Sequence, residues 1–460
     1  MMLLHLASNL KSIIPSMKKI TILAALLALG HAYAQGPAVT SWLQNTTQTG
    51  TYYVSGNSTA IGNNILVNCQ LVEYSNDFVY VHTEGVPAYA TGPFLDGNPS
   101  NATAQGAIYK MPLNPVANTG APTPTTPGTI GAFINGVSLY DYRDGVAWDP
   151  STEELCGGPP GGNPMCPGGM GAAMDWNRDA IPAEMGGFDC SKAHPAMGNY
   201  HHHQNPSAFN LDLSVVSNIC NLYDAEGLYA IDAAQHSPLL GFAYDGFPIY
   251  GAYGYANEDG TGGIARMKSS YELADASNRT GGPSIATWEL GYFREDYVFV
   301  AHPGEDDYLD EHNGRECNTP EYPDGTYAYF CTVDENWNSS YPYVVGPTFY
   351  GTYANRSVNS VTESTTTYES TVGIDAVDAS EINVTVFPNP SADLIVVQIK
   401  GLVTENLPVS VFDLSGKQVA VGTISAGSTI WYLDTRSIYD GTYIIRIGAH
   451  TTKRVIVSRQ

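Results

Sequence analysis

The run Phe78-Val79-Tyr80-Val81 stands between the turn residues Asn76-Asp77 and Gly85. Aromatic and β-branched residues bounded by turn formers are typical of a short β-strand. The same pattern recurs in three further runs, Ile65-Leu66-Val67, Tyr297-Val298-Phe299-Val300 and Tyr327-Ala328-Tyr329-Phe330. No long stretch of the sequence keeps a helical period of apolar residues. The sequence therefore predicts a mostly β protein, with one large β-rich domain over residues 35–353.

The charge of the chain excludes two classes of partner. The 460 residues include 20 Lys and Arg against 45 Asp and Glu, a formal net charge of −25. Nucleic acids and anionic membrane surfaces are bound through clustered cations, so we expect neither as a partner. Because 43% of the residues are hydrophobic and only 14% are charged, the chain can bury a core and is not a disordered protein.

The N-terminal 34 residues have the pattern of an export signal. Lys18-Lys19 precede an apolar run over residues 20–29, and Ala32-Tyr33-Ala34 fits a cleavage site before Gln35. We predict a signal peptide over residues 1–34, with Met17 as the better start. The apolar run is shorter than the roughly 20 residues that span a bilayer, and we expect no transmembrane span elsewhere.

The C-terminal part of the chain differs in composition from the large domain. Residues 354–383 are rich in Ser and Thr without an apolar pattern, which predicts a solvated linker. From residue 384 to residue 460, short strand-like runs return at intervals of about 8–12 residues. This spacing predicts a small immunoglobulin-like β-sandwich.

Export to an oxidising compartment favours disulfides among the seven cysteines. Cys156 and Cys166 bracket a Gly/Pro-rich loop, and Cys317 and Cys331 bracket a turn. We expect both pairs to be bonded, with Cys190 and Cys220 as a third candidate pair. Cys69 would then be a buried free thiol.

The densest group of histidines is His201-His202-His203, preceded by His194. If this stretch is a strand, His201 and His203 point to the same face, about 7 Å apart along it, while His202 points to the other. Two imidazoles on one face can share a metal ion, and a third ligand must come from elsewhere.

The candidates for that third ligand are His194, His236, His302, His312 and Asp245, of which we favour His236 and Asp245. Three such ligands with an open position would suit zinc or copper. The alternative is that the histidines are structural, hydrogen-bonded in a polar pocket.

A second polar group is acidic. Glu305, Asp306, Asp307, Asp310 and Glu311 fall within seven residues. Oxygen-rich loops suit calcium, but the spacing is not that of an EF-hand. We favour a solvated acidic loop over a calcium site.

The C-terminal region resembles the type A C-terminal sorting domain of the type IX secretion system. The matching segments are Phe387-Pro388-Asn389-Pro390, Val411-Phe412-Asp413-Leu414-Ser415-Gly416-Lys417, Gly441-Thr442-Tyr443 and Lys453-Arg454-Val455. The resemblance implies that the type IX machinery recognises residues 384–460. It also implies a protein that is secreted or delivered to the outer cell surface of a bacterium.

The large domain resembles the YHYH family, named for a Tyr-His-Tyr-His motif. Here the motif stands as Tyr200-His201-His202-His203, with His202 in place of the second Tyr. Further matching segments, spread over residues 79–351, are Gly85-Val86-Pro87, Gly92-Pro93-Phe94, His236-Ser237-Pro238-Leu239-Leu240-Gly241, Tyr244-Asp245-Gly246-Phe247-Pro248, Asn313-Gly314-Arg315 and Pro323-Asp324-Gly325. The resemblance supplies a family and no reaction.

Two functions stay open at this level. The first is a metal-binding protein that uses His201 and His203, with hydrolytic or oxidative chemistry at an open position. The second is a non-enzymatic surface module that binds a glycan or a protein. The sequence has no G-x-S-x-G, H-E-x-x-H or P-loop motif that would decide for an enzyme.

Overall fold

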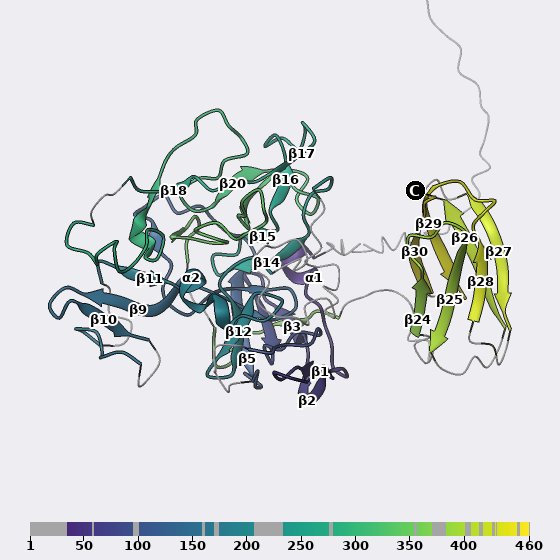
Figure 1. The fold of residues 1–460 in the computed structure, drawn as a ribbon, viewed down its shortest axis with the longest axis horizontal. Coiled ribbons are helices and arrows are strands. Elements are labelled where there is room, and N and C mark those ends of the chain that lie inside the picture. The colour runs from purple at the N-terminus through teal and green to yellow at the C-terminus, as the bar shows by residue number, and fades with distance from the viewer. Residues whose placement is uncertain are drawn as a thin grey trace, which may run out of the picture. The chain divides into compact units, whose positions relative to one another are not determined.

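The chain forms two compact units, which the structure, a computed structural model, divides at Met1–Ser370 and Thr371–Gln460 (Figure 1). We call them the larger and the smaller unit. The described residues are 35–57, 59–94, 101–158, 162–169, 174–206, 233–275, 279–353, 357–369, 383–400, 406–413, 417–425, 428, 430–448 and 451–459. The signal peptide predicted over residues 1–34 lies outside these ranges.

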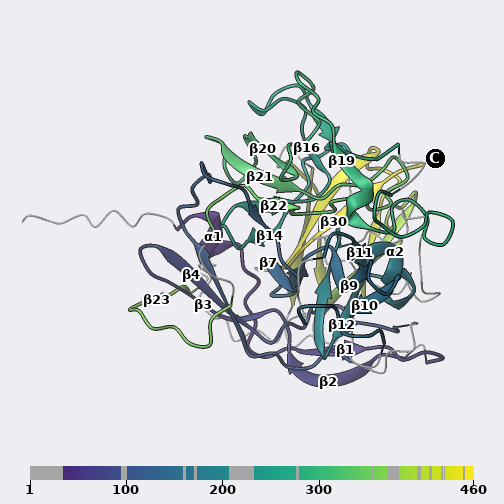
Figure 2. The ribbon, with the colours of Figure 1, turned by 90° about the vertical axis from the view of Figure 1, so that its left-hand side faces the viewer.

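The larger unit is built on an eight-stranded sheet in the order β12-β13-β8-β7-β14-β15-β21-β20. Its strands are β7 (Thr129–Phe133), β8 (Ser138–Tyr140), β12 (Ala193–Ala196), β13 (Asn199–His202), β14 (Leu239–Ala243), β15 (Pro248–Tyr250), β20 (Gly314–Cys317) and β21 (Thr326–Phe330). Most neighbours are antiparallel, but β13 pairs with β8 in parallel, as β15 does with β21. The β12–β13 hairpin thus forms one edge of the sheet (Figure 2).

Smaller sheets surround this one. A four-stranded sheet consists of β3 (Cys69–Tyr74), β4 (Phe78–Thr83), β5 (Ala107–Pro112) and β23 (Thr366–Thr367), and a three-stranded sheet of β9 (Arg143–Asp149), β10 (Glu154–Gly157) and β11 (Asn177–Asp179). Two-stranded sheets pair β1 (Thr49–Tyr52) with β2 (Ile61–Leu66), β6 (Thr123–Pro124) with β22 (Thr348–Phe349), β16 (Tyr253–Tyr255) with β17 (Ile264–Arg266), and β18 (Tyr271–Leu273) with β19 (Tyr297–Phe299). The described helices are short: α1 (Pro37–Thr40), α2 (Ala180–Glu184), and the 3₁₀ turns Met185–Gly187 and Arg294–Asp296.

One continuous apolar core joins the four-stranded and eight-stranded sheets of the larger unit. It includes Val72 and Val81 from the first, and Leu139, Ile249 and Tyr329 from the second, all fully buried. Burial of each such side chain contributes on the order of 1.5–3 kcal/mol to folding. The mostly β fold class is thereby confirmed, with strand runs where the sequence predicted them.

The smaller unit is a sandwich of two antiparallel sheets, ordered β24-β25-β28 and β27-β26-β29-β30. Its strands are β24 (Asn383–Phe387), β25 (Leu394–Lys400), β26 (Leu407–Asp413), β27 (Gln418–Ile424), β28 (Ile430–Asp434), β29 (Gly441–Ile447) and β30 (Thr451–Val457). Val397, Val411, Ile445 and Val455 meet in its core. The immunoglobulin-like detail stays a prediction.

The cysteine predictions had a mixed outcome. Cys156 and Cys166 form a disulfide, and Cys69 is a buried free thiol, as expected. Cys190 is also disulfide-bonded, whereas Cys220 lies outside the described residues. The predicted bond between Cys317 and Cys331 is wrong, because both are free thiols. The register of β20 and β21 explains this: Cys317 lies opposite Thr326, five residues away from Cys331.

The first half of the predicted linker contains a short strand, whose side chains are exposed. Thr366 and Thr367 of β23 pair with Tyr74 and Glu73 at the edge of the four-stranded sheet. The Tyr368 N–H donates to the Val72 carbonyl at 2.8 Å. An unpaired sheet edge offers backbone partners to any extended segment, whatever its side chains, which is why composition alone did not reveal this strand.

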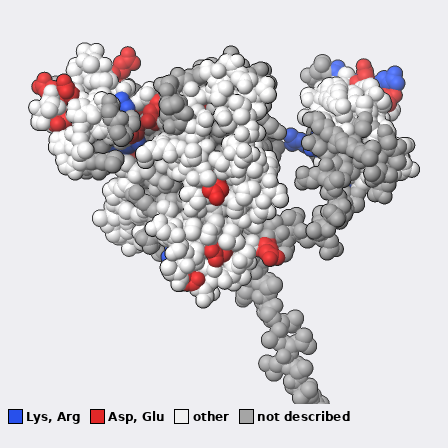
Figure 3. Space-filling view, turned by 90° about the horizontal axis from the view of Figure 1, so that it is seen from below, with Lys and Arg blue, Asp and Glu red and all other residues white. Residues whose placement is uncertain are grey.

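The surface agrees with the excess of acidic residues in the sequence. On the face of the larger unit seen in Figure 3, most side chains are uncharged, and Asp and Glu predominate among the charged ones. Among the described residues, no helix has the length and apolar character that a membrane crossing needs.

The Cys156–Cys166 bond closes a loop with a sequence separation of 10. Replacing both residues with Ala should lower the free energy of unfolding of the larger unit by about 3 kcal/mol, since the unfolded chain gains the freedom of that loop. Urea denaturation measures the change. The variant Cys317→Ala, which removes a buried thiol without a disulfide, corrects for lost packing. Equal stability of the two variants would contradict the prediction.

Candidate metal centre

The β12–β13 hairpin places the histidines. In its antiparallel register His194 lies directly opposite His201, and Ala193 opposite His202. Cross-strand partners point to the same face, so the His194 and His201 side chains are neighbours. The two-residue turn Met197-Gly198 has positive φ at both positions, 49° and 86°, as a tight hairpin turn requires.

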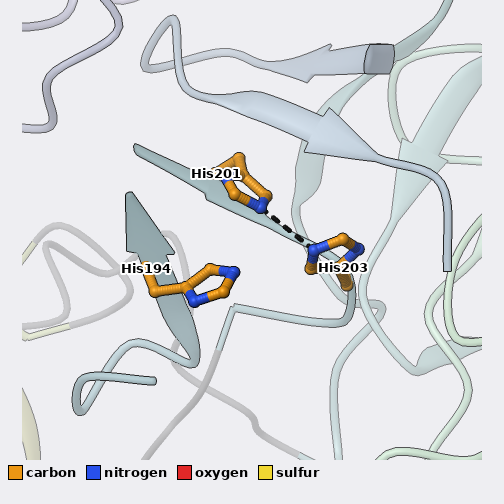
Figure 4. Close-up of side chains that lie close together, drawn as sticks. All are labelled: His194, His201 and His203. Atoms are coloured by element: carbon orange, nitrogen blue, oxygen red, sulfur yellow. Dashed lines mark hydrogen bonds between the residues drawn. The ribbon is translucent and has the colours of Figure 1, made fainter. Parts of the chain in front are cut away.

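Three imidazoles therefore meet on one face of the hairpin (Figure 4). One ring nitrogen each of His194, His201 and His203 lies within 4.8 Å of the other two. His203 follows the last residue of β13, and alternation along the chain gives it the same face as His201. All three are buried, with 6%, 1% and 4% of their surface exposed, so they are not surface histidines.

The closest approach is between His201 and His203. Their Nε2 atoms are 3.0 Å apart. The Nδ1 atom of His201 lies 2.9 Å from the Asn199 carbonyl oxygen, and that of His203 lies 2.5 Å from the Asp141 carbonyl oxygen. A carbonyl only accepts, so each Nδ1 must carry a proton and donate it. In the neutral rings both Nε2 atoms then present lone pairs to each other.

The environment keeps these rings neutral. Burial lowers the pKa of His201 well below its ordinary value, and the neighbouring His203 and His194 lower it further. Burial also lowers the pKa of His203. A proton shared between the two Nε2 atoms would need one cationic ring, which this site disfavours. Neutral imidazole with a fixed Nδ1 proton is the form in which histidine binds metals through Nε2.

Glu184, at the end of α2, is a fourth donor that the sequence did not indicate. Its Oε2 lies 3.2 Å from His194 Nε2 and 3.5 Å from His203 Nε2. Burial by itself would raise the pKa of Glu184, but the adjacent His194 and His203 lower it below its ordinary value. The carboxylate is therefore held in its ionised form next to the histidine group.

Some polar atoms of this group have no hydrogen-bond partner among the described residues. They are both ring nitrogens of His194 and Oε2 of Glu184. Buried polar atoms are nearly always satisfied in folded proteins, so a cluster of unsatisfied ones indicates a site for a ligand or ion.

Aromatic rings wall the site. Tyr140 stacks on His201 with ring centroids 3.8 Å apart, and Phe188 meets His194 edge-on at 4.9 Å. The Glu184 side chain keeps 26% of its surface exposed, while those of His194 and His203 keep 8% and 3%. Solvent thus reaches the group past the carboxylate.

The other two residues of the motif face the core, as strand alternation predicts for His202. The His202 ring packs edge-on against Phe133, with centroids 5.2 Å apart. The Tyr200 hydroxyl donates to the Asp189 carboxylate at 2.7 Å. The substitution of His202 for Tyr in the motif therefore falls outside the histidine group.

The structure does not bring the predicted ligands His236 and Asp245 to this group. The His236 Nδ1 lies 2.7 Å from the Ser237 carbonyl, and its ring packs against Tyr250. Asp245 accepts hydrogen bonds from the Tyr329 hydroxyl at 2.6 Å and from Gly351 N–H at 2.9 Å. Its pKa, raised by burial to about 6, is that of a buried structural carboxyl. The third member is instead His194.

The two remaining histidine candidates and the acidic loop also lie outside the group. His302 stacks on Tyr308 with centroids 3.7 Å apart, and His312 Nδ1 lies 2.6 Å from the Thr348 hydroxyl. In the acidic loop Asp307 pairs with Lys268 at 2.5 Å, and Asp310 accepts from the His312 N–H at 2.9 Å. Asp307 and Asp310 of this loop thus have protein partners.

Comparison with known proteins finds one family match in the larger unit and one in the smaller unit. The protein-family model described as "YHYH protein" matches residues 108–343, just over half of the chain, and includes all four donors. The model described as "Secretion system C-terminal sorting domain" matches residues 385–458. No curated protein and no solved structure matches the chain.

The sorting domain defines a class: this is a bacterial protein that is secreted or attached to the cell surface, and it carries the address that type IX secretion machinery recognises. Within that class, the chain belongs to the YHYH protein family.

The hairpin turn gives a test of how the site is held. A Cβ at Gly198 would lie 2.1 Å from Thr103 Oγ1, and its φ of 86° suits only glycine well. Gly198→Val should therefore destabilise the larger unit by about 2 kcal/mol or more in thermal or urea unfolding. The matched control is Met197→Gly, at a position 93% exposed with φ 49°, where glycine relieves strain. Equal loss in both variants would contradict the assigned turn.

Proposed function

We propose that His194, His201 and His203 bind a divalent transition-metal ion, with zinc or copper the best suited, and that this is the function of the larger unit. The observation that carries the proposal is the Nε2–Nε2 distance of 3.0 Å between His201 and His203. Two lone pairs at that distance repel each other, and a cation held by both removes the repulsion.

The distances suit such an ion. Two nitrogens that each lie about 2.0–2.1 Å from a tetrahedral zinc ion are roughly 3.3 Å apart. The His201–His203 pair is close to this value, and all three nitrogens lie within 4.8 Å of one another. The His194 ring, which packs edge-on against Phe188 and lies 3.2 Å from Glu184 Oε2, is the third nitrogen donor of the set.

Glu184 is the fourth donor in this proposal. It occupies the solvent-facing side, where a carboxylate can bind the ion or give way to water or a substrate. The donor set of three imidazoles and one carboxylate favours zinc or copper over calcium, which prefers six to eight oxygens. A three-nitrogen site with an exchangeable fourth position is the arrangement that hydrolytic and oxidative metalloenzymes share, and reaction chemistry would take place on the Glu184 side.

Metal content tests the proposal. Mature protein purified without a polyhistidine tag should contain about one zinc or copper ion per chain by elemental analysis. The His201→Ala/His203→Ala variant should contain almost none, and metal should no longer raise its melting temperature. For the wild type, an ion at 100 times its Kd should raise the free energy of unfolding by about 2.7 kcal/mol.

His236→Ala is the matched control, because it removes a partly buried histidine outside the group. It should keep the metal content of the wild type. Equal metal in the wild type and the double variant, or loss of metal in His236→Ala alone, would refute the assignment. Glu184→Gln should weaken binding without abolishing it, because three nitrogen ligands remain.

Acid should remove the ion only at low pH. Protons compete for the ligand nitrogens, and the lowered pKa of His201 and His203 shifts that competition below the ordinary histidine value of 6.5. Metal affinity measured by competition with a chelator should therefore stay level from pH 8 to about 6.5 and fall below it. A decline that begins near pH 8 would contradict the neutral, buried state of these rings.

The same shift has a consequence for the metal-free protein. A histidine whose folded pKa is lowered binds fewer protons in the folded than in the unfolded state. Its stabilising contribution is present above pH 6.5 and is lost as the pH falls toward the folded pKa. Stability of the apo protein in urea denaturation should thus decrease from pH 7 to pH 5, and less steeply in His201→Ala than in the wild type.

A further inference from the structure

A cleft of about 430 Å³ opens between the β9–β10 hairpin and the segment around Trp288. Trp148 and Trp288 line it and are both partly exposed. None of its lining residues belongs to the histidine group. The volume lies in the range of small-molecule sites, and tryptophan is the residue most enriched where binding energy is concentrated.

We propose that this cleft binds a neutral oligosaccharide. The C–H face of a pyranose ring is apolar and carries slight positive charge, so it packs well on the electron-rich face of an indole. Two tryptophans provide two such platforms. Around them stand hydrogen-bonding groups of both kinds: the carboxylates of Glu153 and Glu154, the amide of Asn163, and the hydroxyls of Ser284 and Thr287.

The hairpin wall of the cleft is rigid. Trp148 lies on β9 opposite Leu155 of β10, next to Cys156 of the Cys156–Cys166 disulfide. The Gly157 N–H donates to the Pro164 carbonyl at 2.7 Å, and the Asn163 amide donates to the Gly157 carbonyl at 3.3 Å. Asn163 and Pro164 are thereby tied to the hairpin.

The opposite wall is fixed by a buried arginine. Arg279, 4% exposed, donates to the carbonyl oxygens of Trp288 and Glu289 at 2.8 Å each, and to the Asp296 carboxylate at 2.6 Å. The Trp288 ring packs against Tyr292, with centroids 4.8 Å apart. A site whose walls are already ordered loses little entropy when a ligand binds.

The charge of the lining selects among ligands. It contains two carboxylates and no Lys or Arg, so an anionic glycan would be repelled. A cationic amine would satisfy the carboxylates and stack on the tryptophans. It has no acceptor to offer, however, and would leave the hydroxyl donors of Ser284 and Thr287 without a partner in the ligand. The hydroxyls of a neutral sugar both donate and accept, and they can satisfy every group in the set.

The experiment titrates the mature full-length protein with neutral hexasaccharides of glucose, mannose and xylose in different linkages, followed by tryptophan fluorescence and calorimetry. Chitosan and polygalacturonate oligomers serve as the cationic and anionic probes. We expect at least one neutral oligosaccharide to bind, and Trp148→Ala or Trp288→Ala to weaken it at least about tenfold. Trp337→Ala is the matched control, because Trp337 stacks on Tyr253 outside the cleft. It should change affinity less than twofold.

Thr287→Arg is a second test that does not remove a packed tryptophan. Thr287 is exposed, so its replacement fills the cleft and leaves the fold unchanged. It should also abolish binding, and EDTA should leave binding unchanged, which separates this site from the metal centre. The proposal is refuted if no neutral oligosaccharide binds, if Thr287→Arg binds as the wild type does, or if only the chitosan oligomer binds.

Discussion

The approach of His201 Nε2 to His203 Nε2 is the constraint around which the candidate centre is organised. Each ring has committed its Nδ1 proton to a backbone carbonyl, of Asn199 in one case and Asp141 in the other. What remains is two lone pairs that face each other at 3.0 Å. The other two donors follow from chain geometry: the hairpin register brings His194, and α2 ends at Glu184 beside it. Four donors thus come from 20 residues of chain.

The four residues of the family motif, Tyr200 to His203, have two separate structural roles. His201 and His203 face the centre, while Tyr200 and His202 hold the strand against the core. Tyr200 does so through Asp189, which also accepts from the Gly92 and Ser191 N–H groups at 3.0 and 2.9 Å. Burial raises the pKa of Asp189 to about 7 against the lowering effect of these donors. Asp189 therefore joins the motif strand to the Gly92-Pro93-Phe94 segment, which lies far from it in sequence.

Asp245 has a corresponding structural role, since its carboxylate accepts hydrogen bonds from segments that lie far apart in the sequence. A carboxylate in a polar, turn-forming sequence can bind a metal or fasten a turn, and only its neighbours decide. Here Tyr329, Gly351 and Phe247 supply three hydrogen-bond donors. Both oxygens of the Asp245 carboxylate therefore already accept hydrogen bonds from the protein. His236 similarly lies in an aromatic environment made by Tyr250, Tyr255 and Phe330.

The features that depend only on neighbouring residues in the sequence, strand positions and the faces of side chains along a strand, could be predicted from the sequence. Alternation along a strand placed His201 and His203 on one face and His202 on the other, and turn-bounded apolar runs marked strands such as β4 and β21 correctly. Cross-strand register was beyond those rules. It selects His194 over His236 through the turn Met197-Gly198, and it separates Cys317 from Cys331. The same limit hid Glu184, whose sequence neighbours resemble any helix end, and β23, whose Ser/Thr composition resembles a linker.

The unsatisfied atoms of the centre connect its stability to its occupancy. A buried polar atom without a partner costs roughly 1–3 kcal/mol, and His194 Nδ1 is such an atom, while His194 Nε2 and Glu184 Oε2 are paired chiefly with each other at 3.2 Å. A fold selected only for stability would pair or replace them, as it pairs Asp189 and Asp245. Their retention side by side, next to two opposed lone pairs, is understandable if an ion satisfies all of them at once. The groups that weaken the metal-free protein are then the same groups that give the ion its affinity. By contrast, the walls of the Trp148–Trp288 cleft are held by a disulfide and a buried ion pair outside the ligand space, so that site can stay empty at little cost to the fold.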